Sequence, residues 1–479
     1  MYKISQELIE VLEKENINYS HWKSNLLLNE ALGGYDDLDL LVARKDIALF
    51  ESLLLLMGFK EGSNKNISFS SIKHFYGFDK ESGNILHLHV YYQIKTGPSW
   101  TKSMRFDFEE YFLDNLMLHE SGMPIPQKHI ELVLFIFRIM LKYSKVNEFI
   151  LIQKESERTL KEIEYLLNDM DEKKLEDFLD IFFKNISKKD IFDYISIIQN
   201  GNQFNKYIEG KKLKKRLSKY NYTSFLQENI NNISQFTYRV VNKLFLKQKK
   251  KFHTSGMFIV VAGLDATGKT TITTELKKWL GKNMTLSMVH FGKPPSTFLT
   301  LPFNILIKLI RKNSENSNIK SSIQSGHDKP KSFLYIIRQV ILAYDRYFLV
   351  KKYWAKASNG EIVLCDRYKS ENYGVMDSKR LKPELYNGLK YKLAILENHL
   401  YDKMPQPDML FYLTVPVEVA VVRNHERIKE GKESEEFIRI RHEQNQELDY
   451  KAKYHYLVDT NKEYSDVISD IKSKIWNLI

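Results

Sequence analysis

A stretch just past the middle of the chain has the residue types and the spacing that hold a chain of phosphates. The segment VVAGLDATGKTTI, residues 260–272, satisfies the pattern G-x-x-x-x-G-K-[ST]. Its glycines let the backbone curl so that amide groups face a phosphate, its lysine reaches the outer phosphate oxygens, and its threonine hydroxyl binds Mg²⁺. We therefore predict a nucleoside triphosphate site. Its residues are Gly263, Asp265, Ala266, Thr267, Gly268, Lys269, Thr270 and Thr271.

A carboxylate and an arginine stand side by side at the end of another apolar run, EIVLCDRY at residues 361–368. At the end of a buried strand beside the phosphate loop, Asp366 can bind Mg²⁺ or accept a proton from the attacking oxygen. Arg367 is placed to bind a phosphate on the acceptor. No N-K-x-D motif for reading guanine follows at a plausible distance, which disfavours a GTPase. The pair predicts phosphoryl transfer to an acceptor that is itself anionic.

The elements that must position these residues are apolar runs that alternate with helical patterns. The runs MFIVVAG at 257–263 and MLFYLTV at 409–415 show no alternation between apolar and polar residues. Continuous apolar runs are typical of strands that are buried on both faces of a parallel sheet. We therefore expect residues 254–479 to form a P-loop domain with a doubly wound parallel sheet.

Four segments in this half resemble the thymidylate kinase family of nucleoside monophosphate kinases, in the same order and at similar spacing. They are GLDATGKTT, YDRYFLVKKYWAKASNGEIVLCDRY, QPDMLFYLTVPVEVAVVRNHERI and EEFIRIRHEQNQEL. The resemblance covers residues 258–479 and implies ATP and Mg²⁺ as cofactors. It also implies that Asp265 approaches the acceptor's sugar hydroxyl, that Arg367 binds the acceptor's phosphate, and that Arg346 lies near the acceptor's base.

The resemblance implies, in addition, a basic lid that closes over the transferring phosphoryl group. Arg423, Arg427 and Lys432 fall in the corresponding segment. A mobile basic segment suits this chemistry because phosphoryl transfer depends on positioning, on neutralising the phosphate oxygens and on excluding water. The alternative for Arg423 and Arg427, which are four residues apart, is a solvated helix face. The residues predicted to be catalytic are Lys269, Asp366, Arg367, Arg423 and Arg427.

The acceptor side departs from the family. Where the family has an R-E-P-G segment, this chain reads HFGKPPS at 290–296, and Lys293 supplies a point charge that does not reproduce the two-pronged contact of arginine. The segment KSENYGVMD at 369–377 replaces the family's S-x-x-A-Y-Q run. We therefore expect a phosphorylated, nucleotide-like acceptor, dTMP or a relative.

A second pair of carboxylates lies near the N-terminus. Asp37 and Asp39 are two residues apart at the start of the predicted strand YDDLDLLV, so both point to one face. Such a pair fits a divalent metal bound to a nucleoside triphosphate. With Lys23 and Ser24 before it and HLHVYY after it, the region resembles the nucleotidyltransferase fold. It departs from that fold where His87 replaces a third carboxylate and His89 takes the place of the histidine that follows.

The whole chain is predicted to be a multidomain α/β protein. At 479 residues it exceeds what one hydrophobic core supports. We expect a nucleotidyltransferase-like α+β unit at 1–115, a helical region with a basic linker at 116–253, and the P-loop domain at 254–479. One cysteine, no signal peptide and no long apolar span indicate a cytoplasmic protein.

Three functions stay open at this point. The first is a kinase that acts on a small phosphorylated molecule, alone or together with an active N-terminal nucleotidyltransferase. The second is a nucleotidyltransferase acting on a small-molecule or sugar phosphate, with a regulatory ATP-binding domain. The third is an ATP-driven switch or a membrane-surface scaffold, to which the lysine runs at 210–220 and 246–252 would give weak lipid contact. These runs lack interleaved aromatics, so no specific nucleic-acid partner is expected, and a homodimer is allowed.

Overall fold

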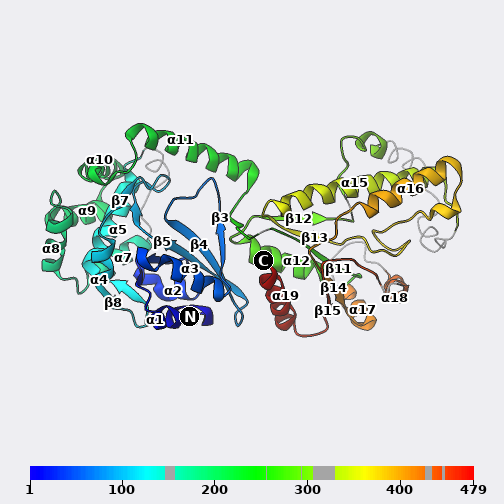
Figure 1. Ribbon diagram of the computed structural model, residues 1–479, viewed down its shortest axis with the longest axis horizontal. Coiled ribbons are helices and arrows are strands. Elements are labelled where there is room, and N and C mark those ends of the chain that lie inside the picture. Colours follow the sequence, from blue (N-terminus) through cyan, green and yellow to red (C-terminus); the bar gives the residue numbers. More distant parts are fainter. Residues whose placement is uncertain (146–156, 255, 293, 306–328, 427–433, 445–447) are drawn as a thin grey trace. The chain divides into compact units, whose positions relative to one another are not determined.

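The computed structural model describes residues 1–145, 157–254, 256–292, 294–305, 329–426, 434–444 and 448–479. The chain forms two compact units, Met1–Gln248 and Lys249–Ile479 (Figure 1). The predicted boundary at 115/116 therefore lies within the first unit, and the units divide shortly before the predicted boundary at 253/254. None of the helices that the structure describes combines the length and the apolar character needed to cross a membrane.

A mixed sheet forms the first part of the N-terminal unit, with strands in the order β1-β2-β5-β4-β3. β2 and β5 are parallel, and the other neighbours are antiparallel. Its elements are α1 (Lys3–Lys14), β1 (Tyr19–His21), η1 (Asn25–Leu27), α2 (Leu28–Leu32), β2 (Leu38–Val42), η2 (Arg44–Asp46), α3 (Ile47–Leu56), β3 (Lys60–Ser63), β4 (Ile72–Asp79) and β5 (Asn84–Tyr91). The strand predicted for YDDLDLLV is observed as β2. No strand was predicted over β4, whose residues do not alternate cleanly between buried and exposed.

Short elements connect this sheet to a group of helices. They are β6 (Ile94–Thr96), β7 (Met104–Phe106), α4 (Glu109–Asp114), β8 (Leu116–Leu118) and β9 (Pro124–Pro126). The helices are α5 (Lys128–Tyr143), α7 (Glu157–Leu167), α8 (Glu172–Phe182), α9 (Lys188–Asn200), α10 (Gln203–Arg216), η3 (Ser218–Tyr220), α11 (Phe225–Val241) and η4 (Asn242–Leu246). The predicted helical character of this region is thus observed.

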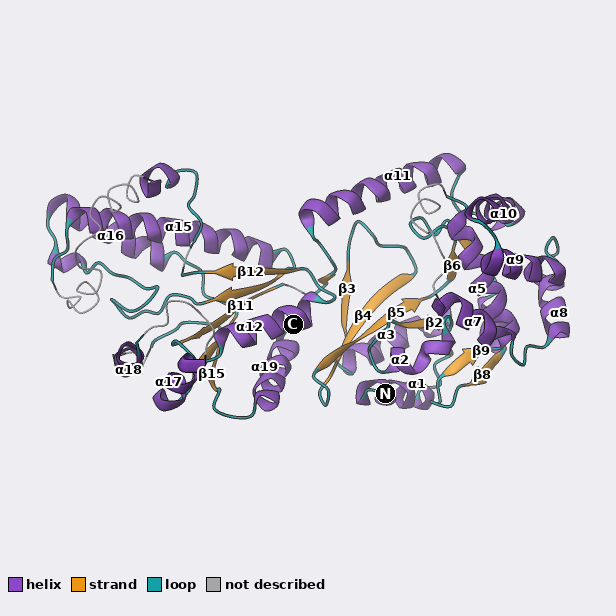
Figure 2. Ribbon diagram, turned by 180° about the vertical axis from the view of Figure 1, so that it is seen from behind, coloured by secondary structure: helices purple, strands orange, loops and turns teal. Residues whose placement is uncertain are grey.

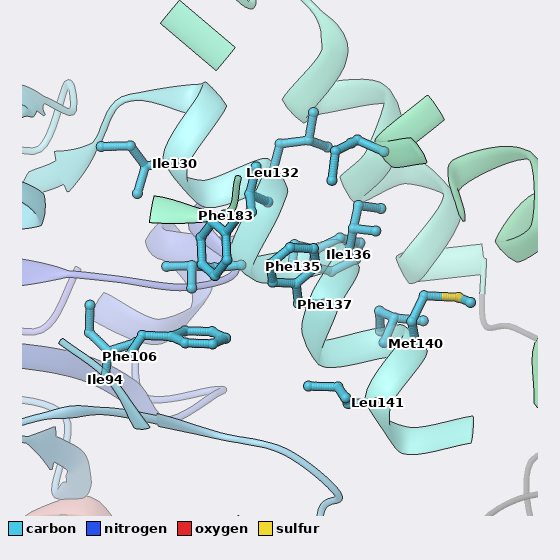
Figure 3. Close-up of a cluster of buried hydrophobic side chains, with 14 of the residues drawn as sticks. Ile94, Phe106, Ile130, Leu132, Phe135, Ile136, Phe137, Met140, Leu141 and Phe183 are labelled. Carbon is cyan, nitrogen blue, oxygen red and sulfur yellow. The ribbon is translucent and has the colours of Figure 1, made fainter. Parts of the chain in front are cut away.

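One apolar core joins these helices to the sheet. α5 is central to it: α7, α8, α9 and α10 pack around this helix, which is buried on nearly all sides. Phe137 of α5 lies beside Phe106 and Phe183 in this core (Figure 3). Trp22, Leu41 and Tyr91, from the sheet region, belong to the same cluster. Burying many large apolar side chains in one cluster fixes the helices against β2, which carries Asp39 and directly follows Asp37.

The C-terminal unit is a parallel sheet in the order β12-β13-β11-β14-β15, as predicted for a doubly wound domain. Its elements are β10 (Lys251–Phe252), β11 (Met257–Gly263), α12 (Lys269–Gly281), β12 (Leu286–His290), α15 (Phe333–Ser358), β13 (Ile362–Asp366), η5 (Pro383–Leu385), α16 (Gly388–Asp402), β14 (Met409–Thr414), α17 (Val417–Glu426), α18 (Glu435–Gln444), β15 (Tyr454–Asp459) and α19 (Tyr464–Leu478). Every residue of β11 is buried, because α15 and α16 cover one face of the sheet and α12 and α19 the other (Figure 2). The edge strand β15 was not predicted, since most of its residues are exposed.

Candidate functional site

The loop between β11 and α12 has the curled backbone that the phosphate motif predicts. Gly263, Ala266 and Gly268 have φ angles of 147°, 64° and 86°, and the helix begins at Lys269. A Cβ on Gly263 would lie 2.6 Å from the carbonyl oxygen of Leu413, so only glycine fits there. Left-handed residues in a loop that ends at a helix N-terminus form an anion-binding concavity.

The side chains of this loop are folded onto it. Lys269 is buried and its Nζ donates a hydrogen bond to the carbonyl oxygen of Leu264, at 2.5 Å. Thr267 Oγ1 donates to the same oxygen, at 2.8 Å. Thr270 and Thr271 are exposed on the first turn of α12. Lys269 is therefore held at the mouth of the concavity, and the Thr270 hydroxyl is open to a ligand.

Asp366 lies next to this loop, at the carboxyl end of β13. Parallel pairing sets it opposite Val261 of β11 and His290 of β12. His290 Nδ1 is 3.2 Å from Asp366 Oδ2, whereas Oδ1 is buried and has no hydrogen-bond partner among the described residues. A buried carboxylate oxygen without a partner is costly unless a cation or water satisfies it. Asp366 and Thr270 therefore fit the Mg²⁺ site expected beside the phosphates.

Asp265 is held by basic side chains. It forms an ion pair with Arg441 of α18, and its Oδ1 lies 3.8 Å from Arg367 Nη2. His442 Nε2 is 3.2 Å from the Asp265 carbonyl oxygen. Burial favours the neutral carboxyl, but Arg441, Lys269 and Arg367 outweigh it and lower the pKa of Asp265 below its ordinary value. Asp265 is thus ionised and ties the phosphate loop to α18.

Arg367 has an unusual backbone for a non-glycine residue, with φ of 71°. Its backbone N–H donates to the carbonyl oxygen of Val261, at 3.0 Å, which fixes this conformation beside the phosphate loop. Its Nη1 lies 3.8 Å from Asp377 Oδ2, and its buried Nε has no partner among the residues described. Strained backbone is tolerated where a side chain must be aimed. The guanidinium retains a free donor for an anionic group.

Arg346 of α15 is buried and already engaged. It forms an ion pair with Asp377, and its Nη1 donates to Tyr401 Oη at 2.6 Å. Its Nε donates to the carbonyl oxygen of Phe291 at 3.3 Å, and the guanidinium lies over the Phe291 ring. In this structure Arg346 therefore holds Asp377 and the segment after β12. Its predicted place near the acceptor's base stays a prediction.

The predicted lid is only partly described. Arg423 of α17 donates to the carbonyl oxygen of Thr460 at 2.8 Å and to its Oγ1 at 3.2 Å, which ties α17 to the segment after β15. Lys293, Arg427 and Lys432 lie outside the described residues. Their predicted roles, and the lid role of Arg423, stay predictions.

Sequence reasoning assigned no role to Arg441, His290 or Asp377, which the structure places around the site. Arg441 lies in the segment EEFIRIRHEQNQEL, which shares in the family resemblance but gives no local signal for a role. His290 could have been found, because it ends a strand of the same parallel sheet as Asp366 and such ends meet at one edge. Nothing in the pattern around Asp377 predicts its pairing with two arginines.

The carboxylates of the N-terminal unit are also paired. His87 Nδ1 lies 2.5 Å from Asp37 Oδ1, and His89 Nδ1 lies 2.9 Å from Asp39 Oδ1. The parallel register of β2 and β5 sets Asp39 opposite His89. Lys23 Nζ is 2.8 Å from the same oxygen of Asp39. His87 and His89 thus pair with the two aspartates.

His74 of β4 extends this arrangement. Its Nδ1 lies 3.0 Å from His87 Nε2, and its ring stacks on that of His89 with centroids 4.4 Å apart. Burial lowers the pKa of His89 to about 3, against the opposing effect of Asp39, so His89 is neutral near pH 7. Burial also opposes the charge on Asp39, but Lys23 and His89 hold its pKa below the ordinary value.

These pairs bear on the metal predicted at Asp37 and Asp39. Across the described ranges, no group of three or more His, Cys, Asp or Glu side chains is arranged to hold a metal ion. The ammonium of Lys23 lies beside Asp39, where a divalent ion would have to bind, and repels it. The side chains present do not fit a metal in this arrangement, and its binding at Asp37 and Asp39 stays a prediction.

Comparison with known proteins supports the C-terminal half of this picture. Residues 261–471 match the family model "Thymidylate kinase". A probable thymidylate kinase of Saccharolobus solfataricus is 25% identical over 223 residues, which are 44% of this chain and 92% of that protein. A thymidylate kinase of Leptospira interrogans is 29% identical over 180 residues, 37% of this chain and 72% of that protein. A solved deoxyadenosine kinase from M. mycoides with bound dATP is 18% identical, with 46% of this chain and 99% of that chain covered and a TM-score of 0.24.

Proposed function

Because the protein is a phosphotransferase of the nucleoside monophosphate kinase class, we propose that its C-terminal unit transfers the γ-phosphoryl group of ATP to a phosphorylated, nucleotide-like small molecule, dTMP or a relative. One observation carries the proposal. The phosphate loop after β11 lies directly beside Asp366, which keeps a buried carboxylate oxygen without a partner among the described residues. A nucleoside triphosphate would supply the anion for the loop, and its cation would satisfy the Asp366 oxygen.

On the donor side, the loop amides and Lys269 bind the phosphates of ATP, and Thr270 and Asp366 would hold Mg²⁺. When bound, this ion neutralises phosphate charge and orients the β- and γ-oxygens. Lys269 leaves the carbonyl oxygen of Leu264 when it turns to the ligand, an exchange of one oxygen partner for another. Charge-assisted contact with phosphate is stronger than a bond to a neutral carbonyl, so the exchange is favourable.

On the acceptor side, Arg367 binds the acceptor's phosphate, with Lys293 and Arg346 as further acceptor residues. An oxygen of that phosphate attacks the γ-phosphorus, the bond from this phosphorus to the bridging β-oxygen breaks, and ADP leaves. Asp265 orients the acceptor through a sugar hydroxyl. Its ion pair with Arg441 brings a basic side chain of α18 to the same place.

The lid proposal completes the site. Arg423, Arg427 and Lys432 would neutralise charge on the transferring group and exclude water. Arg423 is held by Thr460, so any movement of the lid must begin after this tether on α17. The proposal therefore assigns Arg423 to the fixed end of the lid.

The experiment that tests the proposal measures ADP release from ATP and Mg²⁺ across a panel of nucleoside monophosphates and sugar phosphates. We expect one acceptor class to stimulate release and the Lys269→Ala variant to abolish it. Lys277→Ala, an exposed lysine on the same helix, is the matched control and should retain the full rate. Stimulation by dTMP would mean that the altered acceptor segment still accepts thymine. No stimulation by any acceptor would refute the proposal.

The second candidate function is nucleotidyl transfer by the N-terminal unit, either alongside the kinase or with the C-terminal unit as an ATP-binding regulator. The placement of Asp39 on β2, two residues after Asp37, with the histidine partners of both aspartates on β5, favours it. A metal at this pair would require the aspartates to leave their lysine and histidine partners. Release of pyrophosphate from a nucleoside triphosphate, lost in both Asp37→Ala and Asp39→Ala, would support this activity. Unchanged release in both variants would exclude it.

A further inference from the structure

One helix of the N-terminal unit, α11, is attached to the rest of that unit by its polar side. Glu228 of this helix is buried, and its Oε1 lies 3.2 Å from Lys145 Nζ and 2.5 Å from Lys214 Nζ. Seven residues further on, Gln235 Nε2 donates a hydrogen bond to the carbonyl oxygen of Asn66, at 2.6 Å. Because residues seven apart lie on the same face of a helix, these contacts turn one polar face of α11 inward.

The opposite face of α11 is apolar and exposed. The helix runs along the outside of its unit (Figure 1). Half a turn away from Glu228 and Gln235, apolar residues recur every three, four or seven positions along the helix and the turn that follows it. Their exposed fractions run from 40% to 73%, and together they form what we call the apolar stripe: Leu226, Ile230, Ile233, Val240 and Leu244. Single exposed apolar residues are common, but a continuous row on one helix marks an interaction surface.

The chain around the apolar stripe is strongly basic. Residues 210–248 contain nine Lys and Arg residues and one acidic residue, the buried Glu228. Arg216 pairs with Asp190, and Lys212 pairs with Glu209. Five other lysines of this segment are exposed and form no ion pair with a described residue: Lys211, Lys215, Lys219, Lys243 and Lys247. An excess of positive charge thus accompanies the exposed apolar row.

Charge and apolar surface together select the partner. A second copy of this chain would bring the same lysines against these, and like charges repel across an interface. A nucleic acid would neutralise the lysines but would leave the aliphatic side chains without an apolar partner. The surface of a bilayer with anionic lipids supplies both, because its headgroups carry negative charge and its acyl chains are apolar.

We propose that α11 binds the surface of a membrane that contains anionic phospholipids, with the helix axis parallel to the bilayer. The apolar stripe enters the boundary between headgroups and acyl chains, and Lys243 and Lys247 contact headgroups at the end of the stripe. With 17 residues, α11 is about 25 Å long. A helix with one polar and one apolar face lies on a bilayer and does not cross it. This inference is independent of phosphoryl transfer by the C-terminal unit.

The test measures co-sedimentation of the full chain with two kinds of vesicle, phosphatidylcholine alone and phosphatidylcholine mixed with phosphatidylserine. We expect binding to the mixed vesicles that weakens as salt is raised, and little binding to phosphatidylcholine alone. The double variant Leu226→Gln with Ile233→Gln should weaken binding at least tenfold, because it removes apolar area from the stripe. Lys243→Gln with Lys247→Gln should also weaken it about tenfold or more, because each lysine near an anionic bilayer contributes severalfold to the affinity.

Two control variants change equal numbers of similar residues elsewhere in the same unit. Leu55→Gln with Leu56→Gln replaces leucines at the end of α3 that are 61% and 83% exposed. Lys184→Gln with Lys189→Gln removes two exposed lysines at the start of α9 and just before it. Both controls should bind the mixed vesicles as wild type does. Circular dichroism identifies any variant that fails to fold, and the pair at Lys243 and Lys247 then carries the comparison in place of the stripe variant.

The proposal is overturned if the protein binds neither kind of vesicle, if it binds both equally, or if the controls weaken binding as much as the stripe and lysine variants do. Urea unfolding without vesicles adds a second check. A loss of stability in Leu226→Gln with Ile233→Gln would show that the chain itself covers the stripe. A concentration-dependent dimer that this variant abolishes, measured by sedimentation velocity, would assign the stripe to a second copy instead. ADP release is not a readout here, so failure of this inference is distinct from failure of the proposed kinase.

Discussion

The two units place aspartates in comparable positions and then treat them differently. Asp366 ends a strand of the C-terminal parallel sheet, and Asp39 lies where β2 pairs in parallel with β5. Asp366 Oδ1 has no partner in the described part of the chain, whereas Asp39 is met by Lys23 and His89. The first carboxylate needs a cation from outside, while the second already has one from its own chain. Aspartates on parallel-paired strands thus have different ligand requirements, which only the partners of each side chain reveal.

The largest expected effect is on phosphoryl transfer and concerns Asp366 of the C-terminal unit. Replacing Asp366 by asparagine keeps its shape but removes the charge offered to Mg²⁺. We expect the rate of phosphoryl transfer to fall on the order of 100-fold or more. Acceptor-stimulated ADP release measures it, and high Mg²⁺ should restore part of the loss. Asp470→Asn, which alters only an exposed pair with Lys474, is the control. Equal rates for Asp366→Asn and wild type would contradict the proposal that the Asp366 carboxylate binds the cation.

The next effect concerns the stability of the N-terminal unit. Asp39→Ala leaves Lys23 largely buried without its ionic partner, and we expect this to lower the free energy of unfolding by about 3 kcal/mol. Replacing both residues together, as Lys23→Met with Asp39→Leu, should cost less, because no uncompensated charge remains. The measurement is urea unfolding of the full chain, in which the transition of the N-terminal unit is followed. A double variant less stable than Asp39→Ala would contradict this account.

The effect that is smallest per unit of pH is a dependence of stability on pH. Burial, with Lys23 and Arg138 nearby, lowers the pKa of Lys102 from an ordinary value of 10.5 to about 7. Between these values the unfolded chain binds a proton that the folded chain does not, so stability rises with pH from about 7 to about 10.5. The slope from this group is at most about 1.4 kcal/mol per pH unit.

Comparing wild type with Lys102→Met isolates the contribution of Lys102 to the pH dependence of stability, because the other titrating groups are common to both proteins. Their difference in unfolding free energy should change with pH above 7 and be flat well below it. Identical pH profiles for the two proteins would show that Lys102 titrates normally.

Sequence patterns predicted the C-terminal unit well because its signals are local. The glycines and Lys269 lie within one loop, and the apolar runs of β11 and β14 are continuous. The edge strand β15 escaped because a half-exposed strand shows neither a continuous nor an alternating apolar pattern. In the N-terminal unit no strand was predicted over β4, because its residues do not alternate cleanly between buried and exposed.

The partners of the site residues were much less predictable. The pairing of Asp265 with Arg441 spans 176 residues, and that of Asp37 with His87 spans 50. No local pattern encodes such contacts, which depend on how the strands are ordered and registered. The spacing of Asp37 and Asp39 indicated a shared face, but not that lysine and histidine would occupy it. Tertiary pairing therefore decides whether a motif remains open to a ligand.

Cys365 is the only cysteine of the chain, and it lies directly before Asp366 in the middle of the C-terminal sheet. Its side chain is fully buried, and burial raises the pKa of the thiol well above its ordinary value. A thiol reagent should therefore modify the native protein only when β13 opens. The rate of modification then measures how often the strand that carries Asp366 opens. Cysteines introduced on the surface could be labelled selectively, so the protein is ready for fluorescence measurements of distances between its two units.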